Sequence, residues 1–171
     1  MPDPTRRLIY WDANVILSYL DGDDDRFALL DGLLEDSEQK VIEIVTSLIS
    51  TTEVAYAAHE RLHAALDSSV EAAISNLWLP RSPVRVTEVH RNITDAARNL
   101  IRASVTKGWT GLRAHDAIHL ATAQREGVAE FHTYEEHMDR YSALTGFRIC
   151  RPYTDNPRMF ARGRPFSKPP S

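Results

Sequence analysis

The chain is short of cysteine and of long apolar runs, and each shortage excludes a class of protein. The 171 residues contain one cysteine, Cys150, so the chain can build neither a disulfide framework nor a cysteine-based zinc site. No apolar run reaches the roughly 18 residues needed to span a membrane, and the N-terminal sequence MPDPTRR lacks the apolar core of a signal peptide. We therefore expect a soluble, cytoplasmic protein without a membrane partner.

Lysine is also scarce, since the 20 basic residues include only three lysines. Arginine suits bidentate contacts to phosphate, although a bias in genome base composition produces the same excess. The formal net charge of -4 argues against broad attraction to nucleic acid but leaves room for a local basic strip. Charge alone therefore does not identify a partner.

Apolar segments of two periodicities alternate along the chain. Five short segments, rich in β-branched or aromatic residues, predict strands over residues 8–11, 41–47, 84–89, 129–133 and 147–153. Helical periodicity predicts helices over residues 14–20, 25–39, 47–66, 68–79, 92–108, 113–127 and 135–146. Strands separated by helices predict an α/β fold, an α/β/α sandwich around a central, mainly parallel five-stranded sheet. We expect one domain over residues 1–153, followed by a basic, proline-rich, flexible tail over residues 154–171.

Four carboxylates fall where the predicted strands end or where apolar helices have little reason to carry a charge. Asp12 follows the first strand directly, Glu53 lies in the otherwise uncharged TSLISTTEVAYAA, Asp116 is early in an apolar helix, and Glu135 follows the fourth strand. Ligands of open α/β sheets bind at this carboxyl edge. Each residue also has a plain structural interpretation, and for Asp12 the spacing alone favours a helix cap.

A divalent cation would explain why four carboxylates converge at one edge, because they would otherwise repel one another. An all-oxygen ligand set suits Mg²⁺ or Mn²⁺. Such a site commonly activates water and binds a scissile phosphate, so no nucleophilic side chain is needed. We therefore predict that Asp12, Glu53, Asp116 and Glu135 are metal ligands and catalytic residues.

Four segments resemble the motifs of the PIN domain, the fold of the VapC-type ribonuclease toxins: LIYWDANVILSYL, TSLISTTEVAYAA, GLRAHDAIHLATA and FHTYEEH. By position, Asp12, Glu53 and Asp116 match the three acidic residues of the family's metal site. The resemblance implies a PIN-like sandwich and an Mg²⁺- or Mn²⁺-dependent endoribonuclease that leaves a 3'-hydroxyl and a 5'-phosphate. It also implies an RNA substrate, a cognate antitoxin and a homodimer.

The resemblance assigns supporting roles to two further residues. Asn14 matches a polar residue that often supports the first acidic one, and Thr133 matches the hydroxyl residue that precedes the fourth acidic position. That position is usually aspartate, but this chain has Glu135 there, followed by Glu136, and either longer side chain could reach the metal through water.

Arginines supply candidate RNA contacts. Arg91, Arg98 and Arg102 are spaced seven and four residues apart, so they share one helix face. A solvated helix face is the plain alternative, but we expect this stripe and Arg113 to hold the RNA backbone. His119 fits the third motif, and we interpret it as a packed helix residue rather than a ligand.

Three competing functions remain open. The sequence HERLH, residues 59–63, matches the H-E-x-x-H motif of zinc metalloproteases, with Glu60 as the general base. A phosphatase would use Asp12 as a covalent nucleophile, but the lysine and the later acidic pair that it needs cannot be placed. A catalytically inert PIN-like module would only bind RNA or protein.

Overall fold

Five parallel strands form the centre of the molecule. The computed structural model describes residues 6–155. The strands are β1 (Arg7–Trp11), β2 (Ile42–Ser47), β3 (Val84–Thr87), β4 (Glu130–His132) and β5 (Arg148–Cys150). They form one sheet in the order β3-β2-β1-β4-β5, and every neighbouring pair is parallel. The predicted five-stranded α/β sheet is therefore confirmed, and within the described residues it is wholly rather than mainly parallel.

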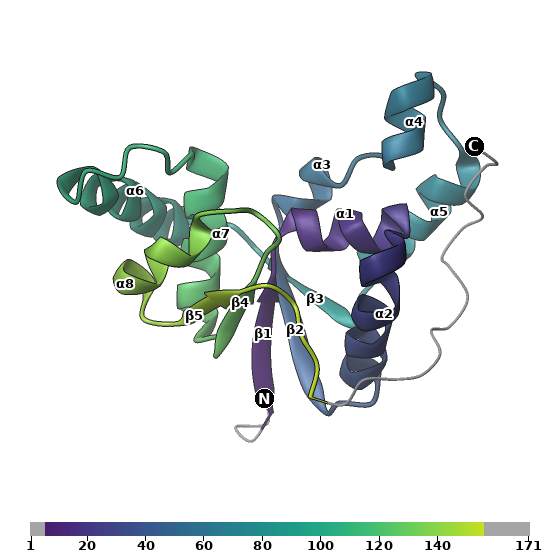
Figure 1. Cartoon of the computed structure of the whole chain (residues 1–171), viewed down its shortest axis with the longest axis horizontal. Coiled ribbons are helices and arrows are strands. Elements are labelled where there is room, and N and C mark those ends of the chain that lie inside the picture. Colours follow the sequence, from purple (N-terminus) through teal and green to yellow (C-terminus); the bar gives the residue numbers. More distant parts are fainter. Residues whose placement is uncertain (1–5, 156–171) are drawn as a thin grey trace.

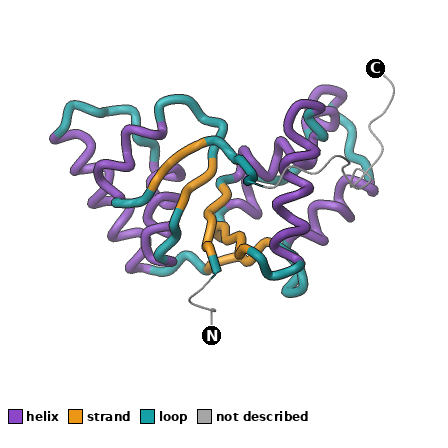
Figure 2. The backbone as a smooth tube through the Cα atoms, turned by 60° about the horizontal axis from the view of Figure 1, so that its bottom comes forward, coloured by secondary structure: helices purple, strands orange, loops and turns teal. Residues whose placement is uncertain are grey.

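Helices connect the strands and cover both faces of the sheet (Figures 1 and 2). Their bounds are α1 (Ala13–Asp21), α2 (Asp24–Glu38), α3 (Ser50–Glu53), α4 (Ala58–His63), α5 (Ser68–Leu77), α6 (Arg91–Thr106), α7 (Ala114–Glu126), the 3-10 helix η1 (Met138–Tyr141) and α8 (Ser142–Thr145). This layering is the predicted sandwich. None of the helices within residues 6–155 is both long enough and apolar enough to cross a membrane.

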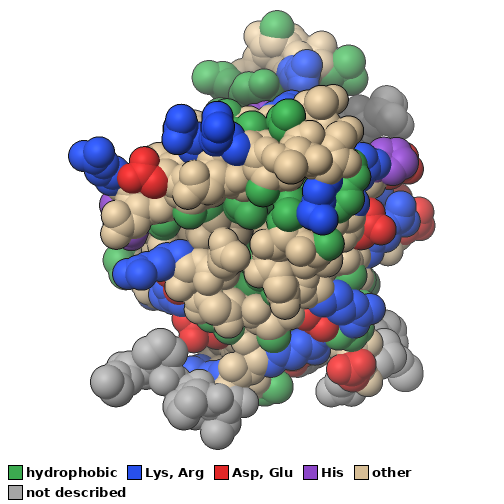
Figure 3. All heavy atoms as spheres, turned by 90° about the vertical axis from the view of Figure 1, so that its left-hand side faces the viewer, with side chains coloured by type: hydrophobic (Ala, Val, Ile, Leu, Met, Phe, Trp, Pro, Cys, Tyr) green, Lys and Arg blue, Asp and Glu red, His purple; other side chains and the backbone are tan. Residues whose placement is uncertain are grey.

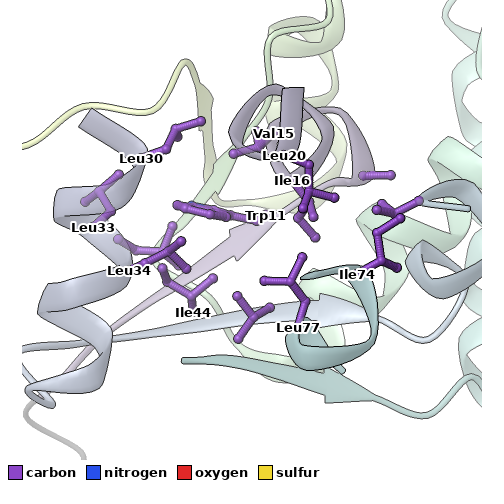
Figure 4. Packing of buried hydrophobic residues seen from close by; sticks show 14 of the residues in the cluster. Trp11, Val15, Ile16, Leu20, Leu30, Leu33, Leu34, Ile44, Ile74 and Leu77 are labelled. Carbon is purple, nitrogen blue, oxygen red and sulfur yellow. The ribbon is translucent and has the colours of Figure 1, made fainter. Parts of the chain in front are cut away.

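Alternating side chains of β1 divide the core into two halves. Ile9 and Trp11, both essentially inaccessible to solvent, pack with β2 side chains against α1, α2 and α5 (Figure 4). Tyr10 points to the opposite face, where its ring stacks on Phe131 at 4.8 Å between centroids. Helices α6 and α7 cover that second face, with side chains such as Leu120 in its core. Because both faces are covered, the carboxyl edge of the sheet is left to carry a site.

The structure contradicts the single helix predicted over residues 47–66. The chain forms one turn of helix in α3, leaves helical geometry at Val54 (φ -94°, ψ 60°), and begins α4 at Ala58. Val54 and Ala57 are both fully buried in the core formed with α1 and α5. Burial of these two side chains requires the chain to turn, so packing overrides the local helical preference. The turn decides where the side chain of Glu53 is held.

The end of the predicted domain is fastened to the start of β1. The Tyr153 hydroxyl donates to Glu130 Oε1 at 2.7 Å and also contacts the Arg7 guanidinium, whose carbon lies 4.9 Å from the Tyr153 ring centroid. Residues 156–171 of the predicted tail lie outside the described residues.

Candidate active site

One cavity at the carboxyl edge of the sheet brings together all four predicted carboxylates. Its volume is about 340 Å³. Its lining residues are Asp12, Ala13, Asn14, Leu17, Glu53, Arg113, His115, Asp116, His119 and Glu135. They come from α1, α3, α7 and the segment after β4, which are far apart in the sequence. The parallel sheet places the ends of these connections side by side, as the strand pattern predicted.

Asp12 is both a helix cap and a cavity residue. Its Oδ1 accepts a hydrogen bond of 3.1 Å from the backbone N–H of Val15, which makes it the N-cap of α1. Its side chain is buried, and burial raises its pKa to about 6, even though a hydrogen bond from the Thr133 hydroxyl favours the charged form. The cap and the site were alternatives in the sequence, but the structure gives Asp12 both positions.

Asn14 and Thr133 join the segments that follow β1 and β4. Asn14 Oδ1 accepts a hydrogen bond of 3.0 Å from the backbone N–H of Tyr134. Thr133 Oγ1 accepts one of 2.9 Å from the backbone N–H of Glu135. Both residues therefore fix the loop that carries Glu135, and their role in supporting a metal site stays a prediction.

Arg113 lies between two of the carboxylates. Its guanidinium donates to Asp116 Oδ2 at 2.9 Å and to Glu135 Oε1 at 2.7 Å. These two carboxylates raise the pKa of Arg113, with Asp116 contributing most. The arginine side chain remains 58% exposed at the rim of the cavity. The predicted phosphate contact therefore pairs with the site's own acids in this structure.

Two histidines line the cavity, and the sequence interpretation missed the position of both. His119 is buried as expected for a packed residue, but its Nε2 lies 2.6 Å from Glu53 Oε2. His115 Nε2 lies 3.3 Å from Asp116 Oδ1. The spacing Asp116-x-x-His119 was the available signal, because residues three apart share one face of a helix.

Glu135 and Glu136 lie in different places. Glu135 lines the cavity with Asp12 and also borders a second depression next to Cys150, whereas Glu136 is exposed and lines only that second depression. Of the two glutamates, it is Glu135 that the structure brings beside the other three acids.

The donors at the cavity fit a hard divalent cation. The four carboxylates surround the cavity without crowding: among residues 6–155, the only three potential ligand side chains with atoms within 4.8 Å of one another are Glu130, His132 and Cys150, outside the cavity. Mg²⁺ typically takes one or two carboxylates directly and keeps several of its waters. Carboxylate oxygens that leave room for metal-bound water therefore fit Mg²⁺ or Mn²⁺ better than a metal that needs a closed set of ligands.

The compact group Glu130, His132 and Cys150 is a structural network. Burial opposes the charge on Glu130, but hydrogen bonds from Tyr153 and Arg7 outweigh it and lower the pKa of this carboxyl. Arg148 adds a second guanidinium at 3.5 Å from Glu130 Oε1. A cation at this place would face two guanidiniums, so we interpret the network as the fastening of the C-terminal segment to the sheet.

The HERLH motif caps its own helix. Glu60 is buried, and its carboxylate accepts hydrogen bonds from the backbone N–H groups of Ala57 (2.9 Å) and Asp67 (2.6 Å). A protease would need this carboxylate to face a metal-bound water. Glu60 instead satisfies the N-terminal end of α4 and the turn into α5, which removes the geometric basis of the metalloprotease interpretation.

The predicted arginine stripe is exposed but lies outside the cavity. Arg91, Arg98 and Arg102 are exposed on α6, with Ile93 buried between the first two. Arg91 also forms an i,i+4 pair with Asp95 at 3.7 Å. On the side of the molecule where α6 lies, Lys and Arg side chains are spread in separate groups (Figure 3). A role of the stripe in RNA binding stays a prediction.

Three solved structures are similar to this chain in fold. The structure of VapBC2 from Rickettsia felis, bound to a DNA fragment from its promoter, matches with a TM-score of 0.58 at 13% identity, over 83% of this chain and 96% of that one. The structure of FitAcB from Neisseria gonorrhoeae matches with a TM-score of 0.57 at 19% identity, over 84% of this chain and 97% of that one. The structure of a toxin–antitoxin complex from Klebsiella pneumoniae matches with a TM-score of 0.53 at 20% identity, over 85% of this chain and 98% of that one. These likenesses establish the shared fold.

A family comparison covers most of the chain. No curated protein matches the sequence significantly. The model of the PIN domain matches residues 9–144. This span includes β2, β3 and β4 and the part of β1 from Ile9 onward, and it ends before β5. The match contains Asp12, Glu53, Asp116 and Glu135. The chain therefore belongs to the PIN-domain family.

Proposed function

We propose that this protein is an Mg²⁺- or Mn²⁺-dependent endoribonuclease that hydrolyses RNA phosphodiester bonds as the toxin of a toxin–antitoxin pair. The observation that carries the proposal is the convergence of four carboxylates from four separate segments on one cavity. Members of the PIN family are typically nucleases and commonly depend on metal, which supports the same conclusion.

The carboxylates of Asp12, Glu53, Asp116 and Glu135 would hold the cation. When bound, a divalent cation supplies an activated water and stabilises the charge that develops on the phosphate. The protein holds its donors in advance: Asp12 is fixed by Val15 and Thr133, and the loop of Glu135 by Asn14 and Thr133. Preorganised charges of this kind need little rearrangement during the reaction.

Arg113 is the side chain best placed to meet the substrate. It is half exposed at the rim and pairs with Asp116 and Glu135, two of the proposed ligands. If these carboxylates held a cation, the Arg113 guanidinium would be free to bind a phosphate with its paired donors. Arg113 then orients the RNA backbone across the cavity.

An antitoxin is the proposed protein partner. The support is that the similar solved structures come from toxin–antitoxin systems, and two of them are described as VapBC2 and as a toxin–antitoxin complex. A homodimer remains a proposal that rests on the family resemblance. The competing function is an inert PIN-like binding module, which would keep the fold and lack cleavage.

The decisive experiment is cleavage of a pool of transfer and ribosomal RNA by the purified chain with Mg²⁺ or Mn²⁺. The controls are EDTA, Asp116→Asn, which keeps the side-chain shape but removes a charge, and Asp67→Asn, a matched change at an exposed helix cap outside the cavity. We expect cuts that disappear with EDTA and with Asp116→Asn but persist with Asp67→Asn. Cleavage by Asp116→Asn at the wild-type rate would refute the assignment, and metal binding without any cleavage would favour the inert module.

A further inference from the structure

A buried chain of hydrogen bonds connects β2 to Glu53 through two side chains outside the predicted ligand set. The backbone N–H of Ser47, the last residue of β2, donates to the Tyr10 hydroxyl at 3.0 Å. That hydroxyl lies 2.6 Å from His119 Nδ1, and His119 Nε2 lies 2.6 Å from Glu53 Oε2. Tyr10 is fully buried and His119 is 3% exposed.

The donors and acceptors in this chain run in one direction. The Ser47 N–H can only donate, so the Tyr10 oxygen accepts from it and has its own proton to give. A carboxylate can only accept, so His119 Nε2 donates to Glu53 Oε2, and Nδ1 of the neutral ring accepts from the Tyr10 hydroxyl. The ring proton of His119 therefore lies on Nε2 and is donated to Glu53.

Glu53 depends on this contact for its direction. It is the last residue of α3, a helix of one turn, and its side chain is 27% exposed. A glutamate has three rotatable side-chain bonds, and holding it in one geometry costs entropy that a short helix does not repay. The hydrogen bond from His119 fixes Oε2 and leaves Oε1 for the cavity.

We propose that Tyr10 and His119 are positioning residues that set the orientation of the Glu53 carboxylate toward the cation, with the His119 proton fixed on Nε2. The inference rests on the proposed function for the identity of the cation. A ligand carboxylate that is held by a hydrogen bond from a neighbouring side chain binds metal more tightly, and loss of such a partner typically costs about 10- to 100-fold in affinity.

The first test is Mn²⁺ affinity, measured by titration calorimetry on the full chain without RNA. We expect His119→Leu to weaken binding about 10- to 100-fold, and His119→Gln, whose amide N–H can take the place of Nε2–H, to restore most of it. His132→Leu is the matched control, because His132 is equally buried and hydrogen-bonded to Glu130, which does not line the cavity. Equal affinity of His119→Leu and the wild-type chain would overturn the inference.

The second test reads the proton of His119 directly and needs no metal. In nitrogen-15 NMR spectra of the metal-free chain, we expect a protonated Nε2 and an unprotonated Nδ1 on His119. Tyr10→Phe removes the hydroxyl that faces Nδ1 and should lower Mn²⁺ affinity less than His119→Leu, because the hydrogen bond from Nε2 to Glu53 remains. A proton on Nδ1 in the wild-type chain would contradict the proposed chain of hydrogen bonds.

The experiments distinguish an error in the proposed chain of hydrogen bonds from an error in the proposed function. If the wild-type chain bound no Mn²⁺ but showed the expected tautomer, the hydrogen-bond chain would stand and the proposed metal site would be wrong, and with it the role of positioning a ligand. If the wild-type chain bound Mn²⁺ and cut RNA but His119 carried its proton on Nδ1, the proposed function would stand and this inference would be wrong.

Discussion

Asp12→Asn should make the protein more stable at neutral pH while removing a proposed metal ligand. The substitution keeps a carbonyl oxygen that can accept from the Val15 N–H, so the cap of α1 is retained. It removes a negative charge that burial disfavours. Stability and metal binding are therefore expected to change in opposite directions.

The size and the sign of the expected change in the free energy of unfolding follow from the pKa of Asp12. The folded value of about 6 lies above the ordinary value of 3.8, so the unfolded chain ionises more easily, and this difference corresponds to about 3 kcal/mol against the folded state above pH 6. Asparagine loses one acceptor for the Thr133 hydroxyl, which costs about 1 kcal/mol. We therefore expect a net gain of about 2 kcal/mol at pH 7.5. The contribution of about 3 kcal/mol should shrink as the pH falls from 6 to 4 and vanish below the unfolded pKa, where the carboxyl is protonated in both states, so the variant should then be about 1 kcal/mol less stable than the wild-type chain.

The assay is urea denaturation of both chains between pH 3.5 and 8 in the presence of EDTA, since a bound cation would stabilise the wild-type chain by mass action. Asp67→Asn is the control of opposite sign. Hydrogen bonds from Ser69 lower the pKa of the exposed Asp67, so its charge stabilises the fold above the unfolded pKa, and this contribution is lost as the pH falls through the folded pKa. If Asp12→Asn proved no more stable than the wild-type chain at pH 7.5, the argument from burial would be refuted.

Two further substitutions separate roles that the structure assigns. Arg113→Ala should strengthen Mn²⁺ binding several-fold in the absence of RNA, because it frees the two carboxylates that Arg113 bridges. It should also weaken RNA binding and reduce the salt dependence of the RNA binding constant by about 1 in slope. Titrations of Mn²⁺ and of RNA at several salt concentrations check both effects, and unchanged RNA affinity would count against a phosphate contact. Glu60→Ala should lower the free energy of unfolding by about 1 to 3 kcal/mol, since the N–H groups of Ala57 and Asp67 lose their acceptor. Mn²⁺ affinity should stay unchanged. Urea denaturation measures the first effect and calorimetry the second, and a loss of Mn²⁺ binding would support a metal site at HERLH.

The sheet and the positions of Asp12 and Asp116 could be predicted because local sequence encodes them. The run LIYW ends at Asp12, and an apolar run that ends in a carboxylate marks both the strand and its edge. Asp116 stands out for the same reason in an apolar helix. The pairing of Arg113 with Asp116 is also local, since the residues are three apart at the start of α7.

The remaining features depend on contacts between distant segments. The break after Glu53 has no glycine or proline to signal it, and it follows from burial of Val54 in a core made by other helices. The second partner of Arg113 is Glu135, 22 residues away, and the partner of His119 is Glu53, 66 residues away. His119 was predicted to be a packed helix residue, and only the fold shows that its partner is Glu53.

The central place of β1 in the strand order sets when the cavity can exist during synthesis. β1 pairs with β2 on one side, but its other neighbour, β4, begins only at Glu130, and Glu135 follows it. A chain emerging from the ribosome therefore carries an unpaired edge of β1 until most of its residues have been made. For a protein whose proposed substrate is RNA, the nascent chain lacks a complete set of acids beside the ribosomal RNA until Glu135 has been made, so the order of synthesis delays assembly of the cavity.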